Sequence, residues 1–563
     1  MKIKAVGINA RYTHSCLALF YLRNELENHS PDFTVEICQY TINDPHYILI
    51  QRLCQGSPDY FFFSSAIWNS ELVTALITDL LMIDESYRFV VGGPQAEIVG
   101  ERFVKSERVT VYQGSIEGAE DRFFSDLAAG RLDHYYHTSF FKTGKTEFGY
   151  PYRPDDFNGP LKNRHMYYES SRGCPFSCTY CLSSAEKGLY HKPLNHVFAE
   201  LADILRHKPS VVRFIDRTFN DVPDRALKIW SYLKEHGDLT LFHFEIAPDR
   251  FTDEMFHFLE GMDAHRFQFE IGIQSTHTKT LEAIKRPINP QSAATVVKKI
   301  RKLETIHLHA DLILGLPFET AELFHQSLND IFAMEPHYIQ MGLLKLLPGT
   351  LIASEAEQNG YRASKKPPYS VFSNKWLDAD SFRELYWLSE CVEKYVNNRY
   401  FVSIWRYLLR SNEDMSRFFS SLSRRLLRQG YYWKAATQET LSSILLAHLQ
   451  PRSDFRVLRE LLCYDWLRCG HRFLPDHLKD ESPGLDTLRK RMFHQLPETL
   501  AGYFDKSDRA YFFKKSVFYL FSRESLHHMG YEVKSAQGII RFSSQREKNV
   551  LRLHRAQLIA EEE

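Results

Sequence analysis

Three cysteines lie in one short segment, residues 173–181, which reads G-C-P-F-S-C-T-Y-C. The C-x-x-x-C-x-x-C spacing lets the thiolates of Cys174, Cys178 and Cys181 bind one metal centre. A 4Fe–4S cluster is usually held by four cysteines, so three leave one iron open to a small molecule. Buried structural thiols and half of a zinc site are the alternatives. A zinc site favours a second cysteine pair, and no such pair follows in the sequence.

Composition narrows the class of protein. The 563 residues, 44% hydrophobic and 25% charged, predict two to four globular domains. The net charge is zero, so nucleic acid is not an expected partner. No apolar run has the length of a membrane span, and we expect no membrane association. The odd number of cysteines, 9, shows no disulfide framework and indicates a reducing, cytoplasmic location.

Residues 1–130 alternate apolar strands with helical stretches, an order that predicts an α/β domain with a doubly wound parallel sheet. Such sheets bind ligands at the carboxyl ends of their strands. The Gly92-Gly93-Pro94 turn allows a ligand to approach the backbone closely, although a plain tight turn explains it too. No G-x-G-x-x-G motif supports a dinucleotide site. The expected strands are 3–8, 33–40, 60–66, 88–91 and 108–113.

Three further regions follow. Residues 131–165, with scattered prolines, are expected to be a linker. Residues 166–378 alternate again and predict six β/α units, fewer than a closed eight-unit barrel needs. Residues 379–563 lack clear strand alternation and predict a mainly helical domain whose role no motif indicates. The strands expected in the barrel are 167–171, 211–215, 241–246, 266–273, 307–314 and 338–346.

The cysteine loop, with the aromatic Tyr180 before its last cysteine, resembles the signature of the radical S-adenosylmethionine (SAM) superfamily. The resemblance implies a 4Fe–4S cluster, SAM and a partial (β/α)6 barrel. A parallel sheet placed before this loop is similar to the Rossmann-like domain of the cobalamin-binding members, including those with a C-terminal domain of unassigned function. The D-x-H-x-x-G motif, which supplies a histidine to cobalt in many cobalamin proteins, is absent, and residues 114–118 resemble the G-E-G-E loop only loosely.

The resemblance implies a cobalamin site at the strand ends of residues 1–130. His14 is a candidate cobalt ligand, but a loop histidine more often forms local hydrogen bonds. The candidate cobalamin-binding residues are Asn9, His14, Ser64, Ser65, Gly92, Gly93, Pro94 and Gly114.

The strand ends of the barrel provide candidates for SAM binding. Asp216 and Thr218 suit the ammonium group of SAM or a helix cap. Glu245, in an apolar strand, needs a ligand or an internal salt bridge. Residues 270–275 resemble the superfamily's ribose-contacting element, and residues 311–317 its D-x-I-x-G-L-P element beside adenine. The candidates are Tyr180, Asp216, Thr218, Glu245, Gln274, Ser275, Gly315 and Leu316.

The expected activity is reductive cleavage of SAM to a 5′-deoxyadenosyl radical, with an electron donor such as flavodoxin or ferredoxin. With cobalamin, the resemblance implies C-methylation or rearrangement of a small molecule or a peptide. The alternatives are a radical SAM enzyme without cobalamin and an iron–sulfur sensor or electron carrier. Among the enzymes without cobalamin, a methylthiotransferase needs a second cluster, for which only Cys16, Cys38 and Cys54 are present in the N-terminal region.

Overall fold

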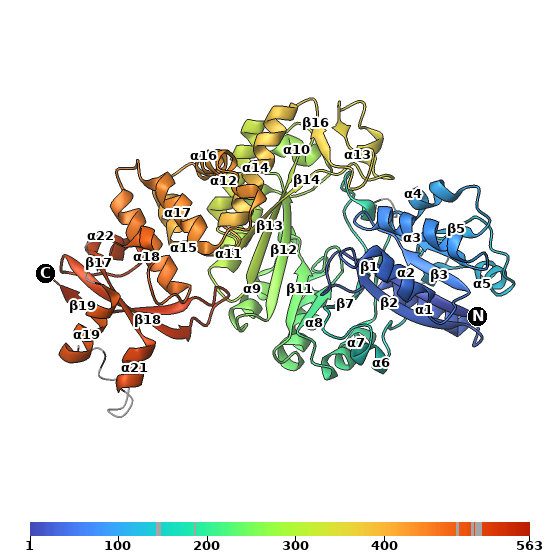
Figure 1. Cartoon of the computed structure of the whole chain (residues 1–563), viewed down its shortest axis with the longest axis horizontal. Coiled ribbons are helices and arrows are strands. Elements are labelled where there is room, and N and C mark those ends of the chain that lie inside the picture. Colours follow the sequence, from blue (N-terminus) through green and yellow to red (C-terminus); the bar gives the residue numbers. More distant parts are fainter. Residues whose placement is uncertain (142–147, 185–186, 480–483, 497–499, 501–508, 563) are drawn as a thin grey trace.

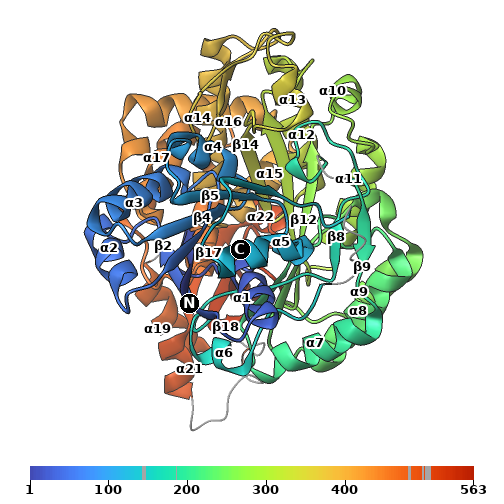
Figure 2. The same ribbon diagram turned by 90° about the vertical axis from the view of Figure 1, so that its right-hand side faces the viewer.

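The computed structural model describes residues 1–141, 148–184, 187–479, 484–496, 500 and 509–562. Part of the expected linker, residues 142–147, lies outside this set. The N-terminal sheet, the barrel and the C-terminal region follow one another along the longest axis of the molecule (Figure 1). In the view from the N-terminal side, the N-terminal sheet lies in front of the barrel (Figure 2). Among the described residues, no helix combines the length and apolarity that crossing a membrane requires.

The N-terminal domain contains the predicted parallel sheet, in the order β2-β1-β3-β4-β5-β6. Strands rich in Ile, Val and Phe are buried on both faces, as expected where helices cover a parallel sheet. The sixth strand, β6, lies within the expected linker and extends the sheet by one strand. The strands are β1 (Lys2–Asn9), β2 (Thr34–Thr41), β3 (Tyr60–Ser64), β4 (Arg88–Gly92), β5 (Val109–Gln113) and β6 (Tyr135–His137). The helices are α1 (Ala18–His29), α2 (His46–Cys54), α3 (Ser70–Ile83), α4 (Ala96–Gly100) and α5 (Asp121–Ala128).

The described residues of the expected linker that follow β6 pack against the barrel. Phe140, Phe148, Tyr152 and Leu161 belong to the same buried cluster as the barrel core. The short helix α6 (Pro154–Asn158) contains Asp156, whose carboxylate accepts two hydrogen bonds from the buried Arg23 guanidinium of α1 at 2.6 and 2.8 Å. This segment therefore fixes the N-terminal domain against the barrel.

The barrel is an open sheet of six parallel strands in the order β14-β13-β12-β11-β10-β7, which confirms the predicted partial barrel. In β12 and β13, buried apolar residues alternate with half-buried polar ones, so one face packs on helices and the other lines the barrel. The strands are β7 (Met166–Tyr168), β10 (Val211–Phe214), β11 (Leu241–Glu245), β12 (Phe267–Gln274), β13 (His307–Leu314) and β14 (Tyr338–Leu343). The helices are α7 (Leu194–Arg206), α8 (Pro223–His236), α9 (Asp253–Glu260), α10 (Thr278–Ala283), α11 (Pro290–Arg301), α12 (Ala321–Met334) and α13 (Leu351–Ser354).

The C-terminal region is mainly helical, as predicted, but it also contains a three-stranded antiparallel sheet that the sequence analysis missed. The sheet strands are β17 (Val517–Ser522), β18 (Gln537–Arg546) and β19 (His554–Glu562). Much of β18 is buried on both faces, so the apolar–polar alternation that marks a half-exposed strand is absent there. The helices are α14 (Ala379–Tyr395), α15 (Val402–Arg410), α16 (Met415–Arg428), α17 (Gln438–Leu449), α18 (Phe455–Arg468), α19 (Leu485–Gln495), α21 (Arg509–Lys515) and α22 (Arg523–His528). A small hairpin, β15 (Arg362–Ala363) and β16 (Val371–Ser373), precedes α14.

Candidate functional site

The cysteine loop leaves the barrel through a small antiparallel hairpin, β8 (Ser171–Gly173) and β9 (Leu189–His191). Gly173 has a φ of +95°, and a Cβ atom there would lie 2.1 Å from the carbonyl oxygen of Gly188. Only glycine meets both requirements without strain. This residue therefore lets the chain turn directly from the hairpin into Cys174.

The thiols of Cys174, Cys178 and Cys181 line one cavity of about 200 Å³ at the carboxyl ends of the barrel strands. The loop is fixed by backbone hydrogen bonds at its centre, where Thr179 donates to the carbonyl of Ile284 and accepts from the amide of Ile352. The loop thus has a defined shape that the surrounding barrel maintains.

Positive charge lies beside the central cysteine. Burial raises the pKa of the Cys178 thiol, and the guanidinium of Arg286, 3.9 Å from its sulfur atom, opposes that effect. Arg286 also lies over the ring of Phe176, which lines the same cavity. An anionic thiolate is therefore better tolerated here than in an apolar pocket.

No three His, Cys, Asp or Glu side chains in the described parts of the chain are arranged to hold a single metal ion. A 4Fe–4S cluster has a different requirement, because each cysteine binds a different iron and the three sulfur atoms need not meet at one point. Three thiols spread along one cavity wall match that donor set.

Three carboxylates line the same cavity as the cysteines. Burial raises the pKa of Glu245 to about 7, although Arg217 lies 3.7 Å away. Burial and the neighbouring Glu270 raise the pKa of Asp311 well above its usual range, whereas a hydrogen bond from His243 lowers that of Glu270. All the carboxylates named here face the cavity. The wall can therefore accept hydrogen bonds and hold protons near neutral pH.

Four of the predicted SAM-binding residues line this cavity, namely Tyr180, Thr218, Glu245 and Gln274. Thr218 brings its hydroxyl oxygen within 3.6 Å of the Cys174 sulfur atom. Gln274 ends β12 with a φ of +71°, and its buried side-chain oxygen has no hydrogen-bond partner among the described residues. That oxygen is available to a ligand.

The structure does not bring the other four to the cavity lining. The Asp216 carboxylate is buried and accepts hydrogen bonds from Ser170 and Ser171, so it anchors the strand that leads to the cysteines. Ser275 is buried and donates to Glu319 at 2.5 Å. Gly315 and Leu316 also lie outside the lining residues. These four residues therefore belong to the structure around the cavity and not to its lining.

Several residues that line the cavity are absent from the predicted set. Glu270 shares a strand face with Gln274, and Asp311 opens the D-x-I-x-G-L-P element, so the two-residue period was a usable signal for both. Arg217 and Arg286 lie in loops, where no periodicity indicates the direction of a side chain.

A second cavity, of about 470 Å³, lies at the carboxyl ends of the N-terminal strands and extends to the barrel. Gly114 has a φ of +104°, and a Cβ atom there would lie 1.9 Å from the carbonyl oxygen of Thr138. The surrounding walls include apolar and aromatic side chains such as Phe62 and Tyr112. The predicted cobalamin-binding residues that line it are Ser64, Gly92, Gly93, Pro94 and Gly114.

Three other predicted cobalamin-binding residues lie outside this lining. Asn9 donates to the side chain of Gln39, and Ser65 is fully buried. The imidazole Nδ1 of His14 is 2.5 Å from the hydroxyl of Tyr167 on β7, so its hydrogen bond reaches the barrel and is not local to its own loop. His14 belongs to the contact between the N-terminal domain and the barrel.

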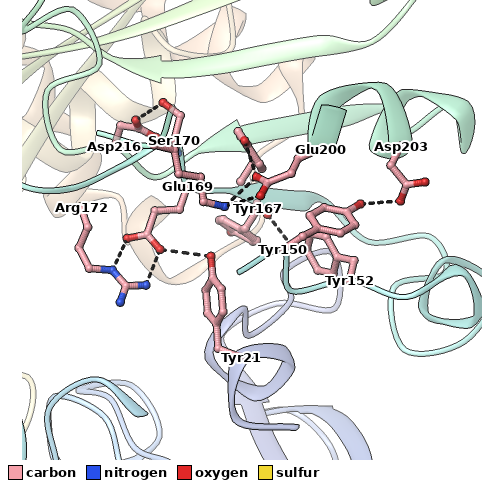
Figure 3. A network of polar contacts seen from close by, with 12 residues as sticks. Tyr21, Tyr150, Tyr152, Tyr167, Glu169, Ser170, Arg172, Glu200, Asp203 and Asp216 are labelled. Carbon is pink, nitrogen blue, oxygen red and sulfur yellow. Dashed lines mark hydrogen bonds and ion pairs between the residues drawn. The ribbon is translucent and has the colours of Figure 1, made fainter. Parts of the chain in front are cut away.

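A buried polar network joins the N-terminal domain to the segment that leads into the cysteine loop (Figure 3). Arg172, two residues before the first cysteine of the loop, contacts Glu169 at 2.8 and 2.7 Å and Glu117 of the N-terminal domain at 2.7 Å. Tyr21 of α1 donates to Glu169 from the other side. Arg172, Glu169, Glu117 and Tyr21 all line the second cavity. The N-terminal domain and the start of the cysteine loop therefore share one set of hydrogen bonds.

The N-terminal cysteines lie on different elements. Cys38 is on β2, Cys54 ends α2 and Cys16 precedes α1. Burial raises the pKa values of the thiols of Cys16 and Cys38, the latter to about 12. Both thiols are therefore protonated at neutral pH, as expected of structural cysteines.

Two family models match the chain. Residues 168–331 match the radical SAM superfamily, and residues 357–540 match a family described as "Protein of unknown function (DUF4080)". The barrel and its cysteine loop are thus a radical SAM domain.

Relatives and a solved structure extend this finding. The chain is 28% identical over 194 residues to the "Uncharacterized methyltransferase PH0819" of Pyrococcus horikoshii, covering 34% of this chain and 41% of that protein. It is 28% identical over 216 residues to the "Cobalamin-dependent radical SAM methyltransferase TokK" of Streptomyces tokunonensis, covering 36% and 31%. The chain thus spans less than half of each relative. The cobalamin-dependent SAM radical enzyme OxsB, solved with aqua-cobalamin and SAM, has the same fold, with a TM-score of 0.54 at 14% identity over 91% of this chain and 82% of OxsB.

Proposed function

We propose that this chain, which carries a radical SAM domain, is a radical SAM enzyme that uses cobalamin and transfers a methyl group to a carbon atom of a small molecule or a peptide. The likeness to TokK supports both cobalamin and methyl transfer, and the shared fold of OxsB supports cobalamin. An electron donor such as flavodoxin or ferredoxin is the expected protein partner.

One observation carries the proposal: the cavity of the three thiols and the cavity of the N-terminal sheet adjoin. Arg217, in the loop after β10, lines both. A substrate beside Arg217 is therefore within reach of ligands in either cavity, as a reaction that uses two cofactors requires.

The residues of the first cavity fit a cluster and SAM. Cys174, Cys178 and Cys181 would hold three irons, and Arg286 favours the thiolate form of Cys178. The free side-chain oxygen of Gln274 suits a hydroxyl donor such as the ribose. Phe176 adds an apolar side chain to the same cavity lining.

The second cavity fits a large, mostly apolar ring with polar edges. Gly92 and Gly93 bring the backbone to the cavity surface, and Phe62 and Tyr112 offer apolar contacts. No histidine lines it among the described residues, so we propose that this chain supplies no imidazole to cobalt.

When bound, the reduced cluster supplies the electron that cleaves SAM to methionine and a 5′-deoxyadenosyl radical, and cobalamin supplies a transferable methyl group. The chain's own residues position and shield the reactants. Arg217, whose side chain is 54% exposed and pairs only loosely with Glu245, is free to bind a substrate oxygen. Glu245 is able to exchange a proton near neutral pH.

The first test is anaerobic reconstitution with iron and sulfide, followed by a reductant and SAM. The protein should release 5′-deoxyadenosine, and Cys178→Ala should lose the cluster absorption and the product together. Cys469→Ala, in the C-terminal region, is the matched control and should retain both. Release of 5′-deoxyadenosine by Cys178→Ala would disprove the cluster assignment.

The second test addresses cobalamin alone. After incubation with hydroxocobalamin and desalting, the protein should show corrin absorption bands. Gly114→Val should abolish them, because the added side chain meets the Thr138 backbone. Gly130→Ala, at a positive φ but with open space around it, is the control for backbone strain. A wild-type protein that retains no corrin would remove cobalamin and leave the radical SAM activity standing.

A further inference from the structure

Three arginines converge on one small cavity at the opposite end of the barrel from the cysteines. Arg301 ends α11, Arg399 follows α14 and Arg406 lies on α15. They line a cavity of about 70 Å³ with His337, which directly precedes β14. The cavity thus lies between the base of the barrel and the C-terminal region.

Few carboxylates balance the positive charge of this arginine cavity. Arg301 and Arg406 each approach one carboxylate, that of the half-exposed Glu304, and only to 4.0 Å. Arg399 forms no ion pair within the described parts of the chain and donates to the backbone carbonyl of Val550. Glu335 also lines the cavity, but its side chain is exposed and its carbonyl, not its carboxylate, accepts from Arg301.

Repulsion between the arginines adds to the effect of burial on their pKa values. After burial itself, the nearby Arg406 is the largest cause that lowers the pKa of Arg301, and Arg301 in turn lowers that of Arg399. Like charges held close together in a partly buried site require a counter-charge to be stable.

A buried hydrogen-bond donor in the same cavity indicates which kind of group supplies the counter-charge. His337 is 5% exposed, and its Nδ1 accepts a hydrogen bond from the Leu308 amide at 3.1 Å. Nearby arginines and burial keep the ring neutral by lowering its pKa, so the ring proton is on Nε2. That buried N–H has no acceptor among the described residues.

We propose that the arginine cavity binds a phosphate group, either inorganic phosphate or the terminal phosphate of a small metabolite. Among the described residues, its three guanidinium groups have no carboxylate nearer than 4.0 Å and its His337 N–H has no acceptor. Arginine forks match the oxygen atoms of phosphate. The cavity is small, which favours the free ion. A bound phosphate joins the barrel to the C-terminal region, because its ligands come from both.

The test uses the full-length, cluster-reconstituted protein under anaerobic conditions. Equilibrium dialysis with labelled phosphate, and thermal unfolding in phosphate against chloride at equal ionic strength, measure binding and its effect on stability. We expect saturable binding and a rise in Tm with phosphate. Arg406→Gln should weaken binding at least tenfold and remove the Tm shift, whereas Arg424→Gln, an exposed arginine on α16, should leave both unchanged.

A second variant, Arg399→Gln, guards against a folding defect in the first, and far-UV circular dichroism checks both. An AMP arm separates the two sources, since a metabolite site should bind AMP more tightly than phosphate and a free-ion site should not. Absence of saturable binding to wild type in both arms would overturn the proposal. So would unchanged binding in Arg406→Gln and Arg399→Gln. None of these outcomes depends on SAM cleavage.

Discussion

The two parallel sheets of this chain use their faces in opposite ways. In the N-terminal sheet, strands such as β3 bury side chains on both faces, so free space occurs only at the strand ends. In the barrel, β12 and β13 bury one face and turn Gln268, Glu270, His309 and Asp311 toward the interior. The N-terminal sheet, covered on both faces, therefore offers a ligand only the ends of its strands. The barrel sheet, covered on one face, offers the whole of its inner face.

The largest effect should come from the doubly buried sheet. Phe61 on β3 is fully buried and stacks on Phe89 at 5.4 Å. Phe61→Ala should destabilise the N-terminal domain by about 3–5 kcal/mol, since a core cavity replaces the ring. Urea unfolding followed by limited proteolysis measures this. Tyr47→Ala, at a 71% exposed position, should cost less than about 0.5 kcal/mol, and equal losses would contradict the two-faced core.

A substitution on the concave face of the barrel should act on activity instead. Glu270→Gln keeps the shape but removes the charge that lies 3.2 Å from the His243 Nε2. We expect 5′-deoxyadenosine formation to fall about 10- to 100-fold with little change in the unfolding midpoint. Glu260→Gln, on the exposed surface of α9, should change neither. A large loss of stability in Glu270→Gln would assign this face to the core.

A smaller effect should appear in the pH dependence of stability. Glu245 has a pKa of about 7 in the folded chain, against an ordinary value of 4.5, so the folded chain holds a proton that the unfolded chain has released. The contribution to stability is therefore complete below about pH 4.5 and is lost as the pH rises through 7. The side chain is 38% exposed, which limits the loss to about 1 kcal/mol. Urea titrations from pH 5 to 8 should show a shallower decline in Glu245→Gln; identical slopes would refute the shift.

The smallest effect on cofactor binding should be that of His14→Ala. The histidine bonds to Tyr167 rather than facing the second cavity. We expect the absorption spectrum of bound cobalamin to stay unchanged and stability to fall by about 1 kcal/mol. A shift of the corrin bands in this variant would return His14 to the list of cobalt ligands.

The sequence predicted the order of elements well because both parallel sheets consist of short apolar strands between helices. Glu245 and Gln274 at the thiol cavity are predictable because they end barrel strands, where side-chain direction follows from the two-residue period. Tyr180 and Thr218 lie in loops and are predictable only from the motifs to which they belong. The sequence did not show that Asp216 and Ser275 lie outside the cavity lining. A polar residue at a strand end either contacts a ligand or forms hydrogen bonds with a neighbouring segment, and only the packing decides between the two. Arg286 gave no signal, because its place depends on a loop.

The Arg172 network has a consequence for how the chain folds. Arg172 and its partners Glu117 and Glu169 are largely buried, and they come from the N-terminal domain and from the segment that leads into the cysteine loop. Removing the N-terminal domain would take away the contacts of Glu117 and Tyr21, leave Arg172 paired with Glu169 alone and expose that pair to water. The segment that leads into the cysteines is therefore held from both domains, and we expect the barrel expressed alone to hold its cysteine loop less firmly than the full chain does.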